Sequence, residues 1–192
     1  MIDSCFSQVN PILYGDFRTH LFGYWTVDGF KQTGCFDMRC SGFVQISKEL
    51  TLGSILEPTS NKTHQYENPF NVFLDKTGNW WLSACDISVG YWPSKLFTSM
   101  SNHAADLAFG GVTYNDPDKN PPPMGSGYYS DDEYTCYARD INIMDGDGVY
   151  KNLDSVDFDI DSFESNCYAQ RVGDFKDGNG YTSYFSGQGC RF

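Results

Sequence analysis

The sequence lacks the residue patterns that zinc sites and histidine-dependent hydrolases need. It has no CxxC pair, and its three histidines, His20, His64 and His103, lie in separate segments. Structural zinc requires closely spaced ligands, and no histidine adjoins a nucleophile motif such as GxSxG. We therefore expect each histidine at the surface or in a loop, and we predict neither a metal site nor a cofactor.

Basic charge is also scarce. Thirteen Lys and Arg stand against 25 Asp and Glu, which gives a net charge of -12 and a pI of about 4.4. A strongly acidic chain is repelled by phosphate backbones and anionic membranes, and no apolar run is long enough for a membrane helix. We expect neither a nucleic acid nor a membrane partner, while the charge alone does not indicate whether the protein works in acid.

Many of the acidic residues gather in residues 154–164, which invites comparison with a calcium loop. An EF-hand starting at Asp157 needs glycine at its sixth position and glutamate at its twelfth. The sequence has Ser162 and Tyr168 there. We interpret the cluster as a solvated acidic loop.

Long stretches of strong helix formers are absent, whereas aromatic residues make up 17% of the chain and glycine is frequent. This composition favours pleated sheets joined by tight turns, so we predict an all-β protein. A chain of 192 residues suits one domain that buries roughly 70% of its unfolded surface. We place the centre of its core at residues 79–112, around Trp80, Trp81, Tyr91 and Trp92.

Alternation and turn residues give the order of the elements. A turn at 10–16 precedes the first strands, and a short helix begins at Pro93 and includes Leu96, Phe97 and Met100. Hairpin turns are expected at Asp28-Gly29, 76–78, 145–148 and 177–180. Strands are expected at 21–28, from 30–33 onward, and at 42–47, 71–75, 79–84, 86–92, 109–114, 134–144, 165–171 and 180–186.

Seven cysteines without zinc-like spacing suggest disulfides and an oxidising compartment. Cys35 and Cys40 could close a small loop, and Cys167 and Cys190 could join the last two strands; buried free thiols are the alternative. Asn61-Lys62-Thr63 is a glycosylation sequon in a polar loop. Against secretion, no signal peptide follows Met1, and nothing assigns partners to Cys5, Cys85 and Cys136.

Eight segments together resemble the neprosin family of plant glutamic endopeptidases, which cut after proline in acid. In chain order these are NPILYGD at 10–16, RTHLFGYWTVDGFKQTGCF at 18–36, CSGFVQIS at 40–47, TGNWWL at 77–82, GYWPSKLF at 90–97, FGGV at 109–112, MGSG at 124–127 and SNCY at 165–168. The resemblance implies a secreted antiparallel β-sandwich, two packed and curved sheets, with a cleft on its concave face. It also implies that the signal peptide, activation peptide and first strands are missing here.

The resemblance further implies a mechanism with two glutamates, one a general base on water and the other a protonated acid. One family glutamate precedes a Gly-Trp upstream of the NP-LYGD motif, and the other follows Gly-Gly. Without gaps these positions fall on Ser4 and Val112, neither of which can titrate, although Asp3 could substitute after a one-residue slip. The glutamates of this chain lie elsewhere, at Glu49, Glu57, Glu67, Glu133 and Glu164.

Three functions follow from these observations. The first is a degenerate, monomeric neprosin-like domain that binds proline-containing peptides without cutting them. The second is an active acid peptidase that uses Asp3 and an unidentified partner. The third is a secreted glycan- or peptide-binding β-sandwich that uses exposed tryptophans.

Overall fold

The computed structural model describes residues 2–3, 6–116, 118–129, 134–145, 147–152, 159, 166–174 and 181–190. Contacts divide the chain into two compact units, Met1–Ala105 (unit 1) and Asp106–Phe192 (unit 2). All pairings between named strands are antiparallel. The predicted all-β antiparallel class is therefore confirmed, while the single domain and the stacking of its sheets as a sandwich stay predictions.

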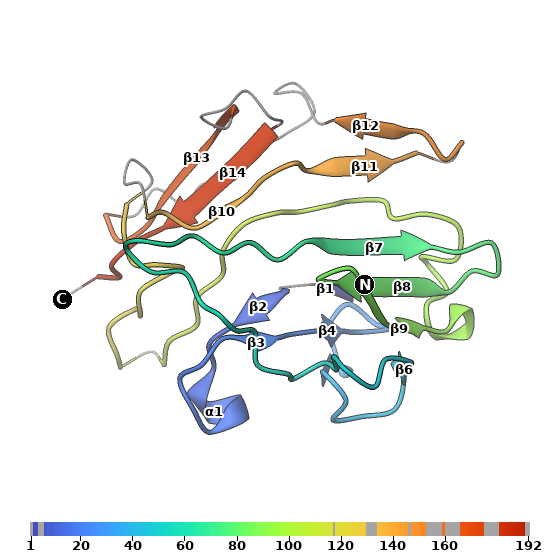
Figure 1. Ribbon diagram of the computed structural model, residues 1–192. Coiled ribbons are helices and arrows are strands. Elements are labelled where there is room, and N and C mark those ends of the chain that lie inside the picture. The colour runs from blue at the N-terminus through green and yellow to red at the C-terminus, as the bar shows by residue number, and fades with distance from the viewer. Residues whose placement is uncertain are drawn as a thin grey trace. The chain divides into compact units, whose positions relative to one another are not determined.

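Unit 1 is built on a four-stranded sheet in the order β6-β9-β8-β7 (Figure 1). Two smaller sheets, β1-β4-β5 and β2-β3, complete its strands. The elements are β1 Ile2–Asp3, β2 Ser7–Gln8, α1 Pro11–Tyr14, β3 His20–Leu21, β4 Tyr24–Trp25, β5 Cys35–Phe36, β6 Val44–Gln45, β7 Phe70–Leu74, β8 Trp80–Ala84, β9 Ile87–Trp92 and the 3-10 helix η1 Ser94–Leu96.

The core of unit 1 lies on one face of this sheet. In β8 the side chains of Trp80, Leu82 and Ala84 are buried in alternation, as the period of a strand requires. Trp92 is 1% exposed and packs edge-on against Phe43, with ring centroids 4.7 Å apart. Residues of β3, β4 and β5 join the same buried cluster, so the small strands cover this face.

Two of the four aromatic residues predicted in the core lie on the opposite face. Trp81 and Tyr91 pair across β8 and β9, and both are half-buried. The Trp81 ring has Phe73 on one side and Tyr91 on the other, with centroids 6.4 and 4.8 Å away. Trp81 and Tyr91 lie outside the core because neighbouring side chains in a strand point to opposite faces of the sheet.

The segment predicted as a turn at 10–16 instead contains a single helical turn, α1. The Asn10 side chain accepts from Leu13 N at 3.0 Å, and Pro11 occupies the first helical position. Gly15 ends the helix with a φ of +81° and donates its N–H to Pro11 O. The residues that signal a turn are thus also those that cap a helix.

The return strand predicted from residue 30 begins instead at Cys35, and residues 27–32 form bends. The cause is Asp28, whose carboxylate accepts from the backbone N–H groups of Lys31, Gln32 and Thr33. A side chain that satisfies these amides competes with strand pairing. The strand that pairs with β4 is therefore only two residues long.

The hairpin turn predicted at 76–78 is confirmed, because β7 and β8 pair on either side of it. There the Asp75 carboxylate accepts from Thr77 N, and Gly78 has a φ of +84°. A further two-residue turn joins β8 to β9 through Cys85 and Asp86, whose φ angles are +51° and +63°. Two-residue turns of this kind normally carry Asn-Gly, because both residues have a positive φ. Cys85 and Asp86 therefore adopt a left-handed conformation that glycine accepts more readily.

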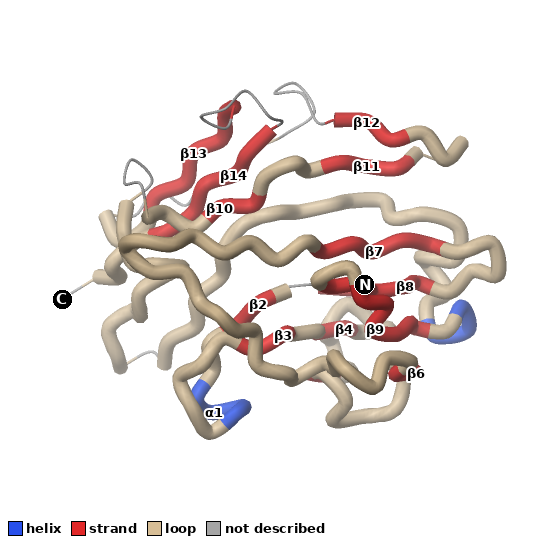
Figure 2. The backbone as a smooth tube through the Cα atoms, in the orientation of Figure 1, coloured by secondary structure: helices blue, strands red, loops and turns tan. Residues whose placement is uncertain are grey.

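Unit 2 holds a three-stranded sheet, β10-β14-β13, and a hairpin of β11 and β12. Figure 2 shows in tan the long segment without regular structure that leads into β10. The predicted strand at 109–114 is wrong, because those residues form no regular structure; the predicted turn at 177–180 lies outside the described residues. The strands are β10 Tyr137–Ala138, β11 Asn142–Met144, β12 Tyr150–Asn152, β13 Ala169–Asp174 and β14 Tyr181–Ser186.

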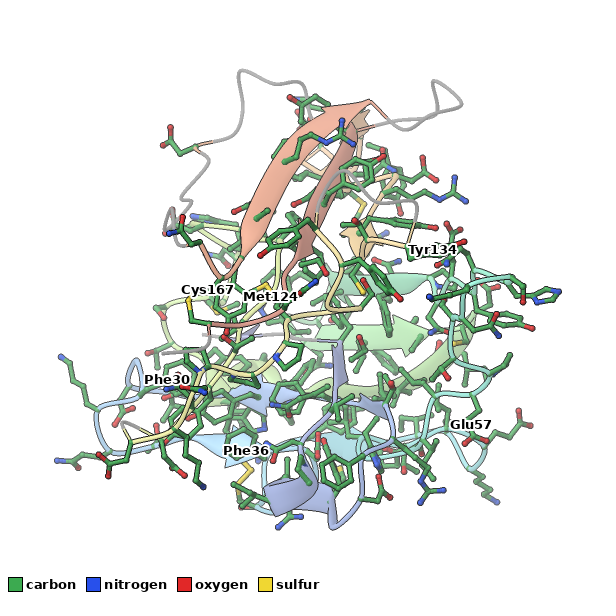
Figure 3. The ribbon with its side chains drawn as sticks, turned by 90° about the vertical axis from the view of Figure 1, so that its left-hand side faces the viewer. Phe30, Phe36, Glu57, Met124, Tyr134 and Cys167 are labelled. Atoms are coloured by element: carbon green, nitrogen blue, oxygen red, sulfur yellow. A yellow bond between two sulfur atoms is a disulfide. The ribbon has the colours of Figure 1, made fainter. Side chains whose placement is uncertain are left out.

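Both predicted disulfides are present. Cys35 and Cys40 have Cα atoms 6.0 Å apart, and Cys167 and Cys190, near the ends of β13 and β14, are 4.7 Å apart. Both separations lie in the ordinary range for a disulfide. Figure 3 labels Cys167. The second bond therefore ties residue 190 to the segment that leads into β13.

The predicted short helix after Pro93 is reduced to η1, with Pro93 as its N-cap and Phe97 just after its end. Phe97 is buried beside Trp25, so tertiary packing rather than a longer helix fixes its position. No helix in the described part of the chain is long and apolar enough to cross a membrane.

We expect Asp86→Gly to raise the free energy of unfolding. Relief of the left-handed backbone is worth about 1–2 kcal/mol, and the extra freedom of glycine in the unfolded chain costs about 0.4–1 kcal/mol. A net gain of about 0.5–1 kcal/mol should appear as a higher urea midpoint. The control Lys76→Gly, in a turn residue without positive φ, should lower the midpoint; an equal effect of both changes would contradict this account.

Candidate functional site

The Val112 segment, residues 109–114 in unit 2, is pinned at Gly111. A Cβ atom added to Gly111 would lie 2.6 Å from Met124 Sδ and 2.6 Å from Phe185 Cδ2. Real Cβ atoms do not approach other atoms so closely, so a side chain at residue 111 would have to displace the side chains of Met124 and Phe185. The MGSG turn, whose Met124 is labelled in Figure 3, and β14 therefore form the surface on which the segment rests.

The segment is held again at Thr113. Its hydroxyl donates to Tyr168 Oη at 3.0 Å, and Tyr168 Oη donates onward to Pro122 O at 2.8 Å. Met124 also exchanges backbone hydrogen bonds with Gly187, at 2.9 and 3.3 Å. Residues that are distant in sequence thus fix both neighbours of position 112.

Val112 itself points to solvent. Its side chain is 81% exposed, and Tyr114 is 79% exposed. A large apolar residue gains little from such a position, whereas a polar or charged side chain would be well solvated there. The contacts of residues 111 and 113 direct the side chain of residue 112 into solvent. Valine at this position cannot act as an acid or a base.

The other position proposed from the sequence lies in unit 1. Ser4 is outside the described residues, while Asp3 is in β1, where it pairs with Tyr24 of β4. Tyr24 stacks between Phe30 and Phe36, with ring centroids 4.5 and 4.1 Å away. Figure 3 labels these two phenylalanines. The backbone of residue 3 is thus fixed opposite an aromatic cluster.

His20 is a correction to the sequence reasoning, because it is 5% exposed rather than at the surface. Its Nδ1 lies 2.8 Å from Gly53 O, and its Nε2 lies 3.0 Å from Asp16 Oδ1. The ring stacks on Tyr14 at 3.9 Å between centroids. The spacing of Asp16, Arg18 and His20, every second residue, was the signal that could have revealed the network.

The partners of His20 fix its charge. A carbonyl oxygen can only accept, so Nδ1 must carry a proton. Hydrogen bonds from Arg18 keep the pKa of Asp16 well below its usual range, so the carboxylate also accepts and Nε2 must be protonated too. Burial works to lower the pKa of His20, but its bonds to Gly53 and Asp16 outweigh this and raise it. The contacts of buried His20 therefore favour its imidazolium form.

A buried acid, Asp37, adjoins this network. Asp37 Oδ1 accepts from Gly23 N at 2.9 Å, and Oδ2 accepts from Tyr14 Oη at 2.8 Å. Burial raises the pKa of Asp37, although both hydrogen bonds oppose the shift. The same burial and the bond to Asp37 raise the pKa of Tyr14. These groups tie α1 to β5 and serve structure.

The linings of two surface pockets in unit 1 contain no pair of carboxyl groups. Each lining has one carboxyl group, Asp86 in one and Asp75 in the other. Glu49, Glu57 and Glu67 are exposed, and Glu133 and Glu164 lie outside the described residues. No cluster of His, Cys, Asp or Glu suited to a metal ion occurs in the described part of the chain.

The structure shows the state of two of the three cysteines to which the sequence assigned no partner. Cys85 and Cys136 are free, and Cys5 lies outside the described residues. Burial raises the pKa of both free thiols, which keeps them in the unreactive protonated form. Neither therefore has the character of a nucleophile.

A comparison with protein families matches residues 4–188 to the Neprosin family. The chain belongs to the neprosin family. The match spans nearly the whole chain, so the resemblance predicted from its motifs is confirmed. Membership supports a peptidase-related function of the chain in general terms.

Gly111→Ala should destabilise the protein, while Val112→Glu should not. The added Cβ overlaps Met124 and Phe185, and overpacking of this kind costs about 1–3 kcal/mol; an exposed substitution stays within about 0.5 kcal/mol. Urea unfolding of both variants tests the difference. A stable Gly111→Ala variant would show that the segment is not pinned there.

The His20 network predicts a specific pH dependence. Because the folded-state pKa of His20 is raised, its contribution to stability is complete below about pH 6.5 and is lost as the pH rises through the folded pKa. Thermal unfolding of the natural chain and of His20→Gln should therefore differ most in mild acid and converge in mild base. A difference that is constant with pH would mean that His20 is neutral in the folded state.

Proposed function

We propose that this neprosin-family domain is non-catalytic and binds proline-containing peptides without cutting them. The observation that carries the proposal is Val112, a side chain held outward by Gly111 and Thr113 at the position where the family resemblance expects a glutamate. The scaffold for the functional group is retained while the group itself is replaced.

The chemistry of a glutamic peptidase explains why this replacement matters. Water must lose a proton to one carboxylate, and a second, protonated carboxyl must donate to the substrate. The two expected positions carry Ser4 and Val112, and a hydroxyl or an isopropyl group does neither. Loss of a group that acts in the transition state lowers the rate more than it lowers binding, so peptide binding can outlast catalysis.

Asp3 is the nearest acidic alternative to the first glutamate. Its side chain is one methylene shorter than that of glutamate, and a misplacement of about 1 Å costs on the order of a hundredfold in rate. It would also need a second carboxyl at position 112. These requirements favour the non-catalytic function over an active peptidase that uses Asp3.

An extracellular setting accompanies this proposal. The two disulfides are typical of proteins that fold in an oxidising compartment, and the neprosin family is consistent with that location. Trp25, Trp80 and Trp92 are buried and Trp81 is half-buried, so the tryptophans do not favour the glycan-binding alternative, which needs exposed rings.

The test compares cleavage of a proline-containing peptide by the natural chain and by a Ser4→Glu, Val112→Glu double variant at about pH 4, near the pKa of glutamate. We expect no turnover by the natural chain and measurable turnover by the double variant. A matched Ser4→Gln, Val112→Gln variant has side chains of the same size without the carboxyl groups and should stay inactive.

Two outcomes would contradict the proposal. Turnover by the natural chain that disappears in Asp3→Ala would identify an active enzyme that uses Asp3. A natural chain that neither cuts the peptide nor binds it in a fluorescence titration would show that the peptide-binding role is absent as well.

A further inference from the structure

The loop at residues 57–69 of unit 1 is the longest run of exposed residues in the part of the chain that the structure describes. Buried Leu56 precedes it and β7 follows it, so both ends are anchored while the loop stays in solvent. Glu57, its first residue, is labelled in Figure 3. The loop carries the one Asn-X-Ser/Thr sequence of the whole chain, at Asn61-Lys62-Thr63.

Hydrogen bonds orient the side chain of Asn61. Its Oδ1 accepts from Thr63 N at 2.9 Å, from Thr63 Oγ1 at 2.8 Å and from His64 N at 3.0 Å. Asn61 N also donates to His64 O at 2.8 Å, which closes the turn. All of these bonds involve the carbonyl oxygen or the backbone, whereas Nδ2 has no hydrogen-bond partner among the described residues.

We propose that Asn61 carries an N-linked glycan that protects the 57–69 loop from proteolysis. In the transfer, Nδ2 forms a bond to C1 of the sugar of a lipid-pyrophosphate-linked oligosaccharide. The bond from C1 to the phosphate oxygen breaks, Nδ2 loses one proton, and the lipid pyrophosphate leaves. The modified amide keeps Oδ1 and its three hydrogen bonds, so the folded loop accommodates the glycan unchanged.

Protection matters because this loop has the features that proteases select. Exposed loop tips outside regular structure are preferred cleavage sites, and Lys62, within the sequon, is a tryptic site. A bulky, hydrated oligosaccharide on the adjacent residue blocks access to the Lys62-Thr63 bond. The proposal does not depend on whether the domain binds or cuts peptides.

The test uses the full chain secreted from a eukaryotic host behind a heterologous leader. We expect an intact mass above that of the polypeptide by one glycan, and removal of the glycan by peptide-N-glycanase should leave Asp at position 61, about 1 Da heavier than Asn. Asn61→Gln and Thr63→Ala should lack the glycan, while Thr63→Ser should keep it. Secreted natural chain at the bare polypeptide mass would overturn the proposal.

Limited trypsin digestion tests the protective role. Cleavage after Lys62 should be on the order of tenfold slower in the glycosylated chain than in Asn61→Gln. Cleavage after Lys31, in another exposed loop, is the internal control and should be equal in both. Equal rates at Lys62 would refute protection even if the glycan is present.

Discussion

The rest of unit 1 depends on the burial of the Trp92 side chain. This indole is almost entirely removed from water, edge-on against Phe43, at the end of the strand that pairs with both β6 and β8. Full burial of a ring this large supplies a substantial part of the hydrophobic free energy of a small unit. The adjacent Pro93 then turns the chain so that Phe97 meets Trp25 from the same side.

Local signals predicted much of the fold. The hairpin at 76–78 follows from Asp75 and Gly78, and both disulfides follow from spacing and strand order. The failures arose where a side chain or a distant segment decided the outcome. Asp28 satisfies amides that would otherwise pair in a strand, and residues 109–114 have a strand-like sequence but no strand partner in the described part of the chain.

For the candidate site, the sequence predicted which positions belong to it but not the contacts that hold them. Motif matching assigned residues 4 and 112, but nothing local indicates that Gly111 rests on Met124 and Phe185, which lie 13 and 74 residues further along the chain. Buried His20 was missed for a related reason. Its acceptors include a carbonyl 33 residues away, and a buried charge is stable only when such partners are present.

The tight contact at Gly111 also bears on how the gene can change. Folding constrains residue 111 because any side chain there meets Met124 and Phe185, whereas the exposed residue 112 is under no such constraint. Selection for a stable fold therefore acts on residue 111, while it leaves residue 112 free to carry side chains of different chemistry.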